Sequence, residues 1–287
     1  MTRRLASAVG STALLLGAAC CYILTLSEVH TFDALSYVTS VERKPWQEVF
    51  HPHHLAYGPL GTLALAAGRV LGYSGGAALP MQLVNAVAGA LGVALLFRVL
   101  LGLTRRTDLA LAAALLMGSA YAYWYYAVEI EVYTVAAVLL IVCLGLMARV
   151  SQPGVPRPTW LYAGLGLAQA GAVLFHQTNV LLCGPVLVLA LAEARRQREQ
   201  LWRVLADWAA YALVFALGVV LPYLWVGFAV SRFATFDEFQ GWMTEYARTG
   251  WWGGPLTIDK LGKLGVGLSQ TLTPVGGGWA WLALGGV

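Results

Sequence analysis

Long apolar runs dominate this chain and constrain its fold more than any other feature. They occupy eight windows, at residues 5–27, 80–103, 108–126, 132–149, 160–175, 178–193, 204–229 and 264–287. A helix of about 20 apolar residues crosses the hydrocarbon core of a bilayer. Only 11% of the residues are charged, against about 25% in a soluble domain. We therefore expect an all-α, polytopic membrane protein, with about eight spans in one domain over residues 1–287.

Charge placement decides between two topologies. Residues 55–73 are apolar but short for a span, and they contain Pro59, Arg69 and several glycines. If this segment crosses the membrane, the basic clusters at 105–106 and 195–203 fall outside, against the positive-inside rule. If it lies in the outer interface as a short helix, every later cluster falls inside. The second topology agrees better with the positive-inside rule.

That topology separates the charges by side. The inner side then holds eleven basic residues, Arg3, Arg4, Arg98, Arg105, Arg106, Arg149, Arg157, Arg195, Arg196, Arg198 and Arg203, and four acids, Asp108, Glu193, Glu199 and Asp207. Residues 28–79 become a large first outer loop with short interfacial helices, and 230–263 a second outer loop. We expect a multi-pass protein of the cell membrane with a cytoplasmic N-terminus. All five histidines and the acids Asp33, Glu129 and Glu131 then lie at the outer or periplasmic face.

The two ends of the chain carry separate expectations. The first apolar run follows Arg3 and Arg4 and is long for the core of a signal peptide, which favours an uncleaved first helix. The last run stops at Val287 without a basic flank, so we expect a chain truncated at its C-terminal side.

Asp33 is the first candidate for chemistry, because it follows the first helix among apolar and aromatic neighbours. Burial at a membrane surface raises the pKa of a carboxyl group and fits it to act as a general base near neutral pH. The alternative is that Asp33 caps a short interfacial helix.

Three histidines, His51, His53 and His54, stand within four positions before Tyr57 and Pro59. In an extended segment, His51 and His53 face one way and His54 the other, so one segment supplies at most two good metal ligands. A divalent cation therefore stays an open alternative. Hydrogen bonds from the imidazoles to a phosphate or a sugar are a second reading, and an interfacial polar turn is a third.

Two further outer segments are rich in polar groups. Residues 123–126 are four consecutive aromatics, typical of an interfacial belt, and they precede Glu129, Glu131 and Tyr133. If this segment is helical, Glu129 and Tyr133 share a face and Glu131 points elsewhere. The turn at 176–179, His176-Gln177-Thr178-Asn179, reads either as a binding segment or as a helix cap. In the loop 230–263, Arg248 could hold a lipid phosphate or face headgroups.

Several function classes lack support. The chain contains no P-loop, no GxGxxG after a strand and no HExxH. Nothing in it indicates a nucleic-acid partner.

Together, these motifs resemble the GT-C superfamily of membrane glycosyltransferases, and most closely its protein O-mannosyltransferase branch and prokaryotic relatives of unassigned function. The resemblance rests on Asp33 after the first helix, residues 51–54 before a short Pro/Gly helix, residues 124–133, and residues 176–179, and it covers about residues 1–230. It implies a GT-C-like helical bundle. It also implies a polyprenyl-phosphate sugar donor in the membrane lipid, and a protein, lipid or glycan acceptor.

The resemblance implies roles for individual residues. Asp33 becomes the general base or the group that orients the acceptor, and Glu131, with Glu129 as the substitute, becomes the second acid. The expected substrate contacts are His51, His53, His54, Tyr57, Tyr133, His176, Gln177, Asn179 and Arg248. The chain departs from the family where Asp33 is followed by Ala34 instead of a second acid, and where it ends after about eight spans.

The expected reaction is an inverting transfer of a sugar to an acceptor hydroxyl. A transporter or flippase is the main alternative, and such proteins place ionisable groups near the midplane of the membrane. Here the expected midplane polar groups are few, namely Gln82, Asn85 and Gln169. A non-catalytic assembly subunit is the third possibility.

Overall fold

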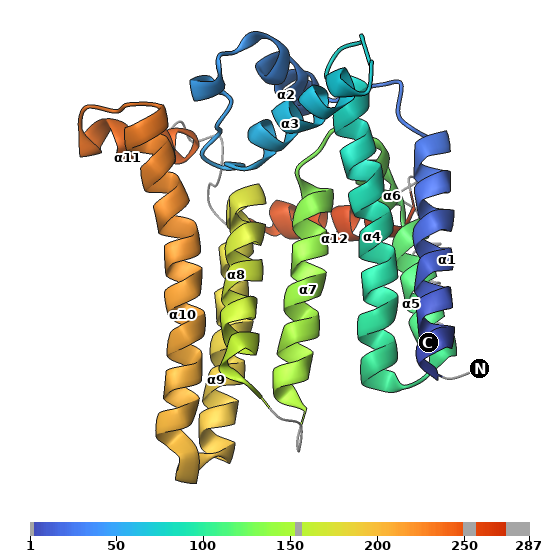
Figure 1. The fold of residues 1–287 in the computed structure, drawn as a ribbon, viewed down its shortest axis with the longest axis vertical. Helices are drawn as coiled ribbons and strands as arrows, with labels where there is room; N and C mark the ends of the chain where they lie inside the picture. The colour runs from blue at the N-terminus through green and yellow to red at the C-terminus, as the bar shows by residue number, and fades with distance from the viewer. Residues whose placement is uncertain (1–2, 153–156, 249–256, 274–287) are drawn as a thin grey trace.

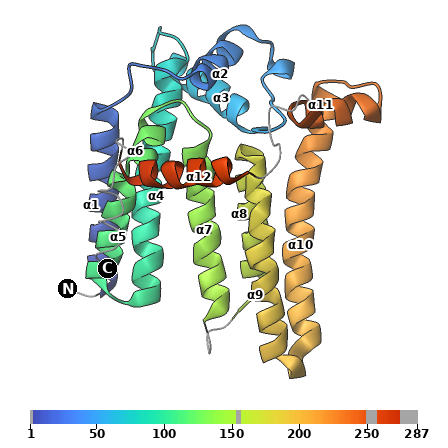
Figure 2. The same ribbon diagram turned by 180° about the vertical axis from the view of Figure 1, so that it is seen from behind.

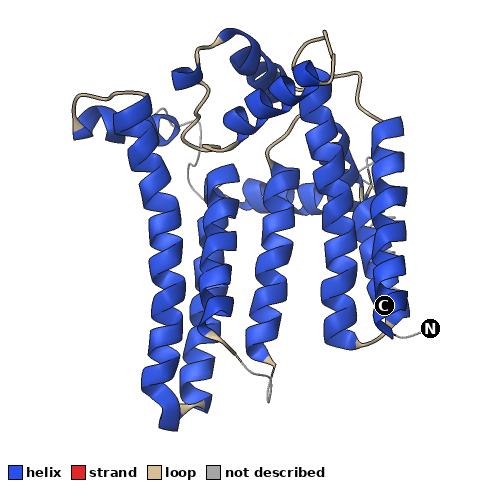
Figure 3. Cartoon of the chain, viewed as in Figure 1, coloured by secondary structure: helices blue, strands red, loops and turns tan. Residues whose placement is uncertain are grey.

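Helices form the regular secondary structure of the described residues, which are 3–152, 157–248 and 257–273 of a computed structural model. Within these ranges there is no β-sheet, only an isolated bridge between His51 and His54 (Figure 3). The α-helices are α1 Arg3–Leu24, α2 Phe32–Arg43, α3 Tyr57–Val70, α4 Ala78–Thr104, α5 Thr107–Ser119, α6 Tyr121–Val128, α7 Tyr133–Ser151, α8 Thr159–Phe175, α9 Cys183–Arg196, α10 Leu201–Leu224, α11 Phe236–Arg248 and α12 Ile258–Leu272. Short 3₁₀ turns, Trp46–Glu48, Gln177–Leu182 and Arg198–Gln200, and a π-helical turn, Trp225–Val230, join some of them. The prediction of an all-α protein is confirmed.

Four helical stretches of the described chain are long and apolar enough to cross a membrane: Ala78–Thr104, Tyr133–Ser151, Gln177–Arg196 and Leu201–Val230. Three apolar helices are shorter, Ala8–Leu24, Thr107–Ser119 and Thr159–Phe175. These are the helices of a multi-pass membrane protein. Each of the seven overlaps one of the apolar windows of the sequence.

The long helices run side by side and alternate in direction (Figures 1 and 2). Helices α2, α3 and α11 lie together at one end of this bundle, which we call the capped end. The opposite end holds the turns that carry Arg105, Arg106, Arg195 and Arg196, and we call it the arginine end. The arginine pairs at 105–106 and 195–196 and these short helices therefore occupy opposite ends.

Helix α3 does not run along the bundle. Its 14 residues span about 21 Å, less than the ~30 Å of a hydrocarbon core. It packs on α2 and the start of α4 through Tyr57, Met81 and Val41, which share a buried cluster.

Two of the apolar windows do not form the single membrane-spanning helix that we expect from the sequence. The run 108–126 is broken at Ala120, whose backbone is extended, so α5 and α6 are separate helices. The predicted span 264–287 is wrong in its first part. Residues 264–272 belong to α12, which begins at Ile258 and lies across the bundle (Figure 2), and 274–287 fall outside the described residues.

Helices α8 and α10 approach each other closely at Gly166. A Cβ atom on Gly166 would lie 2.5 Å from the carbonyl oxygen of Tyr211 and 3.0 Å from the nitrogen of Phe215. Small residues allow such a close approach of helix backbones in membrane proteins. A cluster of buried side chains that includes Cys143, Leu165 and Trp208 surrounds this contact.

Candidate functional site at the capped end

The polar groups of the capped end come from segments far apart in the sequence. They are the linker after α1, the start of α2, the turn at 51–54, the loop 129–132 between α6 and α7, and the turn at 176–178. All five histidines, Asp33, Glu129 and Glu131 lie on these segments, so the predicted site residues of the outer loops gather at one end of the bundle (Figure 1).

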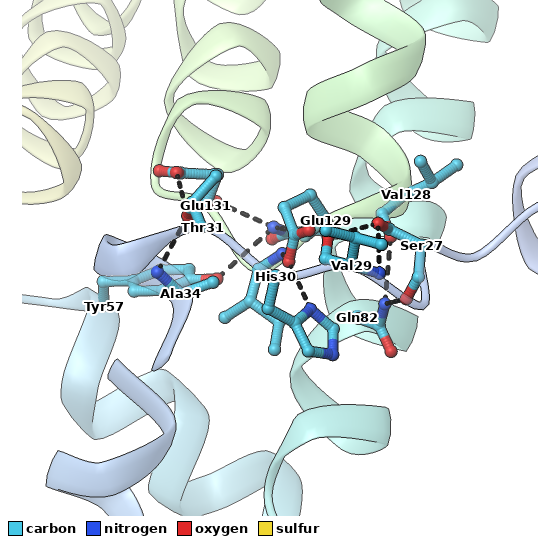
Figure 4. A network of polar contacts seen from close by, with 12 residues as sticks. Ser27, Val29, His30, Thr31, Ala34, Tyr57, Gln82, Val128, Glu129 and Glu131 are labelled. Atoms are coloured by element: carbon cyan, nitrogen blue, oxygen red, sulfur yellow. Dashed lines mark hydrogen bonds and ion pairs between the residues drawn. The ribbon is translucent and has the colours of Figure 1, made fainter. Parts of the chain in front are cut away.

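Two amides on α4 hold the loop 129–132. The Asn85 side chain is fully buried, and its Nδ2 donates to the carbonyl oxygens of Glu129 at 2.6 Å and Glu131 at 2.8 Å. One turn earlier, Gln82 donates to the carbonyls of Ser27 at 2.8 Å and Val128 at 3.1 Å (Figure 4). Both amides therefore lie near the capped end, and the expectation that they sit at the midplane is wrong.

The carboxylate of Glu129 is fully buried and serves the loop itself. Its Oε1 lies 2.8 Å from Nδ1 of His30 and accepts the N–H of Ile130 at 2.8 Å. Among the described residues, its Oε2 and the Oδ1 of Asn85 have no hydrogen-bond partner. Because Glu129 is turned to His30 (Figure 4), it anchors the linker after α1 and is poorly placed to meet a substrate.

Glu131 points the other way, toward the start of α2. Its Oε1 accepts the hydroxyl of Thr31 at 3.2 Å (Figure 4). Burial raises the pKa of Glu131 to about 7, and the nearby carboxylate of Asp33 contributes to this rise, while the Thr31 hydroxyl opposes both effects. A carboxyl group with this pKa changes protonation in the neutral range.

Residues 129–132 form an extended turn and not a helix. Glu129 has φ −109° and ψ 172°, and α7 begins only at Tyr133. The condition under which Glu129 and Tyr133 share a helix face is therefore not met. The side chains of Glu129 and Glu131 instead leave this turn in different directions (Figure 4).

Asp33 is exposed, in the first turn of α2. The helix cap is Thr31, whose hydroxyl accepts the N–H of Ala34 at 3.0 Å, so the alternative in which Asp33 is the cap is wrong. The first turn of a helix favours a negative charge. Asp33 thus combines an exposed carboxylate with a fixed backbone, close enough to Glu131 to perturb that carboxyl group.

The three histidines at 51–54 form a turn instead of an extended strand. The N–H of His54 donates to the carbonyl of His51 at 3.0 Å, and their rings stack with centroids 5.5 Å apart and an angle of 17°. The ring of His53 lies 5.5 Å from that of His51. The expectation that His54 faces away from His51 is therefore wrong, because the turn folds the rings together.

These imidazoles lose their positive charge on burial. Burial and repulsion from His53 lower the pKa of His51 to about 4, and burial with repulsion from His51 and His176 lowers the pKa of His54 to about 3. The Nδ1 of His54 lies 3.2 Å from the carbonyl of Phe175. A carbonyl only accepts, so Nδ1 carries the hydrogen and Nε2 of the neutral ring keeps a lone pair.

A row of rings joins the histidine turn to the acids. Ring centroids are 5.0 Å apart between His54 and His176, 5.1 Å between His176 and Tyr133, and 4.7 Å between Tyr133 and Tyr126. Tyr133 is 40% exposed, so the row has an open face. It runs beside Glu131, whose charge acts on Tyr126 and Tyr133.

Three of the other predicted contact residues make hydrogen bonds within the protein, and the fourth lies outside the described side chains. Gln177 donates to the carbonyl of Pro52 at 2.8 Å, and Asn179 to that of Ala172 at 2.8 Å, which closes the last turn of α8. Tyr57 is buried, with its hydroxyl 3.3 Å from Nδ2 of Asn85. Arg248 ends α11, and its side chain lies outside the described part of the chain. We read the first three as supports that shape the site.

The sequence left open whether the histidines of the turn at 51–54 bind a metal ion. Over the described ranges, no three His, Cys, Asp or Glu side chains are grouped so as to hold a metal ion. The four clustered histidines pack ring against ring, whereas ligands of one ion turn their donor atoms toward a common point.

Sequence reasoning missed the residues that position this site. Asn85 appeared as a midplane polar group and Thr31 not at all, although a threonine directly before a helix with an acid in its first turn gives a standard N-cap signal. It also missed a buried network at the arginine end, where Glu193 accepts hydrogen bonds from Arg157, Tyr162, Gln197 and Trp208.

The description of this site rests on the structure of this chain alone. Comparison with protein-family models, with curated proteins and with solved structures gives no match to this chain.

Proposed function

We propose that this protein is a membrane glycosyltransferase of GT-C type, which moves a sugar from a polyprenyl-phosphate donor to an acceptor hydroxyl. The observation that carries the proposal is the pair of unlike carboxyl groups, exposed Asp33 and buried Glu131, at one end of a bundle of apolar helices. A lipid-linked donor enters such a site from the bilayer, and its polar head reaches the helix ends. We place this end at the outer face of the cell membrane, because basic residues collect at the other end.

The two carboxyl groups suit two roles. Asp33 is exposed in the first turn of α2, so it accepts the proton of the acceptor hydroxyl. Glu131, with a pKa of about 7, carries a proton for part of the time and can donate a hydrogen bond to the sugar or to the acceptor. Two carboxyl groups of one site can take separate acid and base roles when their environments differ in this way.

The transfer balances without a further reactant. The acceptor oxygen forms a bond to the anomeric carbon from the face opposite the phosphate. The bond from that carbon to the phosphate oxygen breaks, and the lipid phosphate leaves with the electron pair. The proton of the hydroxyl passes to Asp33.

The histidine turn supports binding of the phosphate. Neutral imidazoles at His51 and His54 leave no excess positive charge before the donor arrives, and an adjacent anion favours their protonation. A protonated His54 would then have a hydrogen on Nε2 to donate. The open face of Tyr133, beside His176, offers a flat surface for the sugar ring.

A transporter or flippase is less well supported. The polar groups assigned to the midplane are engaged in structural bonds: Gln82 and Asn85 hold loops, and Gln169 accepts the hydroxyl of Tyr211 at 2.6 Å. Alternating access would have to break these bonds, which cost about 1–3 kcal/mol each when left unpaired in a buried site. A non-catalytic assembly subunit would show no transfer in the assay below.

The test is release of lipid phosphate by the purified full-length chain from a panel of polyprenyl-phosphate sugars, with and without EDTA. Asp33→Asn should lower transfer by about 100-fold or more, the usual contribution of a general base. The matched control is Asp237→Asn. The tripeptide Thr-Phe-Asp occurs at 31–33 and again at 235–237, and both begin helices at the capped end. Full activity of Asp33→Asn, or equal losses in both variants, would rule out the role given to Asp33.

A further inference from the structure

The hydroxyl of Thr31 makes two hydrogen bonds at once. It accepts the N–H of Ala34 at 3.0 Å and so caps α2, and it donates to Oε1 of Glu131 at 3.2 Å (Figure 4). A hydroxyl has one hydrogen and two lone pairs, so both bonds can form together. One side chain thereby joins two segments that lie 100 residues apart in the sequence.

The cap fixes the backbone that carries Asp33, two residues further along the chain. Ala34 is fully buried, in a cluster with Tyr57 and Ile130, so the first turn of α2 has little freedom to shift. Glu131 is fixed from the other side, because Asn85 binds its carbonyl oxygen at 2.8 Å. The Thr31 hydroxyl bonds these two anchored segments to each other directly.

The second Thr-Phe-Asp tripeptide shows what a cap needs. Thr235 accepts the N–H of Glu238 at 3.2 Å, and the carboxylate of Glu238 accepts the N–H of Ala234 at 2.8 Å. This is a local exchange between a threonine and a glutamate, close to the capping-box pattern. In α2 the equivalent of Glu238 is Ala34, and the carboxylate beside the capping hydroxyl is Glu131, from another part of the chain. The contact to Glu131 is therefore additional to capping.

We propose that Thr31 is a positioning residue for sugar transfer, setting the carboxyl group of Glu131 against Asp33. This inference rests on the proposed function. Thr31 itself need not touch the donor or the acceptor.

The bond also acts on the charge of Glu131. A hydroxyl that donates to a carboxylate favours the ionised form, and Thr31 opposes the rise in the pKa of Glu131 caused by burial and by Asp33. Loss of the hydroxyl should therefore raise the pKa of Glu131 further. The titratable groups that act on Glu131 or interact with its neighbours are Asp33 of α2, Glu129 of the same loop, His30 bound to Glu129, Tyr57 of α3, Tyr125 and Tyr126 of α6, and Tyr133 of α7.

Three variants of the full-length protein separate positioning from capping. Thr31→Val keeps the shape but removes both hydrogen bonds, Thr31→Ser keeps the hydroxyl, and Thr235→Val removes a cap that has no contact with Glu131 among the described bonds. The first readout is the titration of Glu131 by NMR of ¹³C-labelled glutamate, with Glu131→Gln used to assign the signal. The second is kcat and KM for the lipid-phosphate sugar as a function of pH.

Thr31→Val should raise the Glu131 midpoint by about half to one pH unit. It should also lower kcat by about tenfold, while KM for the donor stays within about twofold, since only orientation is lost. Thr31→Ser should restore both, and Thr235→Val should change neither. An unchanged Glu131 midpoint in Thr31→Val, or an equal change in Thr235→Val, overturns the positioning role. An inactive wild-type protein overturns the proposed function, and the reaction role of Thr31 with it.

Discussion

At the scale of single residues, the burial of Glu131 ties the stability of the capped end to pH. Its pKa rises from 4.5 to about 7 in the folded chain. The folded state therefore binds the proton more tightly than the unfolded state, so the stabilisation is fully present below pH 4.5 and is lost as pH rises through 7. The contribution of Glu131 to the free energy of unfolding should change by an amount on the order of 3 kcal/mol, because a tenfold difference in proton affinity corresponds to about 1.4 kcal/mol.

Glu131→Gln should remove this dependence. Thermal unfolding in detergent, followed from pH 4.5 to 8, should show the wild-type midpoint falling relative to that of the variant as pH rises, because the histidines with lowered pKa values shift both midpoints alike. Glu28→Gln, at an exposed position in the same linker region, should retain the wild-type slope. Equal slopes in wild type and Glu131→Gln would contradict the raised pKa.

Asn85 supports a second prediction at this scale. Asn85→Leu leaves the carbonyl oxygens of Glu129 and Glu131 unpaired in a buried site, at a cost of about 2–3 kcal/mol. The midpoint of thermal unfolding should fall by several degrees. The exposed substitution Gln240→Leu should stay within about 0.5 kcal/mol of wild type, and a similar result for Asn85→Leu would mean that the loop is held by other contacts.

The identities of the acids could be read from the sequence, but their roles could not. The distribution of charge along the sequence predicted that Asp33, Glu129 and Glu131 share one side of the membrane, and the structure brings them to one end of the bundle. The choice between the two glutamates depends on His30 and Thr31, which bind Glu129 and Glu131 across 99 and 100 positions of sequence. Such long-range hydrogen bonds leave no periodicity in the sequence, so only the fold assigns Glu129 to His30 and Glu131 to Thr31.

At the scale of elements, the close approach of α8 and α10 makes a sharp prediction. Gly166→Ala puts a methyl group 2.5 Å from the carbonyl oxygen of Tyr211, and backbone atoms cannot move aside as a flexible side chain can. Forcing extra volume into a packed site costs about 1–3 kcal/mol. The variant should lower the thermal midpoint and expose Trp208, next to Tyr211 in the same cluster, which a change in the wavelength of tryptophan emission would report.

Gly164, two residues earlier on the same helix, is the matched control. A Cβ atom there would meet only Cδ1 of Leu146 at 3.9 Å, an ordinary contact. Gly164→Ala should be neutral or slightly stabilising, since alanine is the better helix former. If both variants behave alike, α8 and α10 are not packed at Gly166.

Apolar runs predicted most helices, and the misses have physical reasons. Hydropathy detects membrane-length apolar segments, so α4, α7 and α10 follow directly from it. It is insensitive to a break such as Ala120, where the chain turns without losing its apolar character. It also reads α12 as the start of a span, although Lys260 and Lys263 give that helix a polar side.

At the scale of the whole molecule, the two ends of the bundle differ in charge and therefore predict an orientation. The turns of the arginine end carry Arg105, Arg106, Arg195, Arg196 and Arg198, while the acids and histidines of the candidate site lie at the capped end. Cytoplasmic loops are enriched in arginine and lysine. The capped end should therefore face outward, which is also where a lipid-linked sugar would meet its acceptor.

Cysteine labelling tests this orientation independently of any activity. In a chain whose native cysteines Cys20, Cys21, Cys143 and Cys183 are replaced by alanine, Glu48→Cys lies at the capped end and Gln200→Cys in the turn between α9 and α10. Both positions are exposed. A membrane-impermeant maleimide applied to intact cells should label Glu48→Cys at once and Gln200→Cys only after permeabilisation. The reverse pattern would place Asp33 and Glu131 in the cytoplasm, and it would require a donor presented on the inner leaflet in place of the outer one.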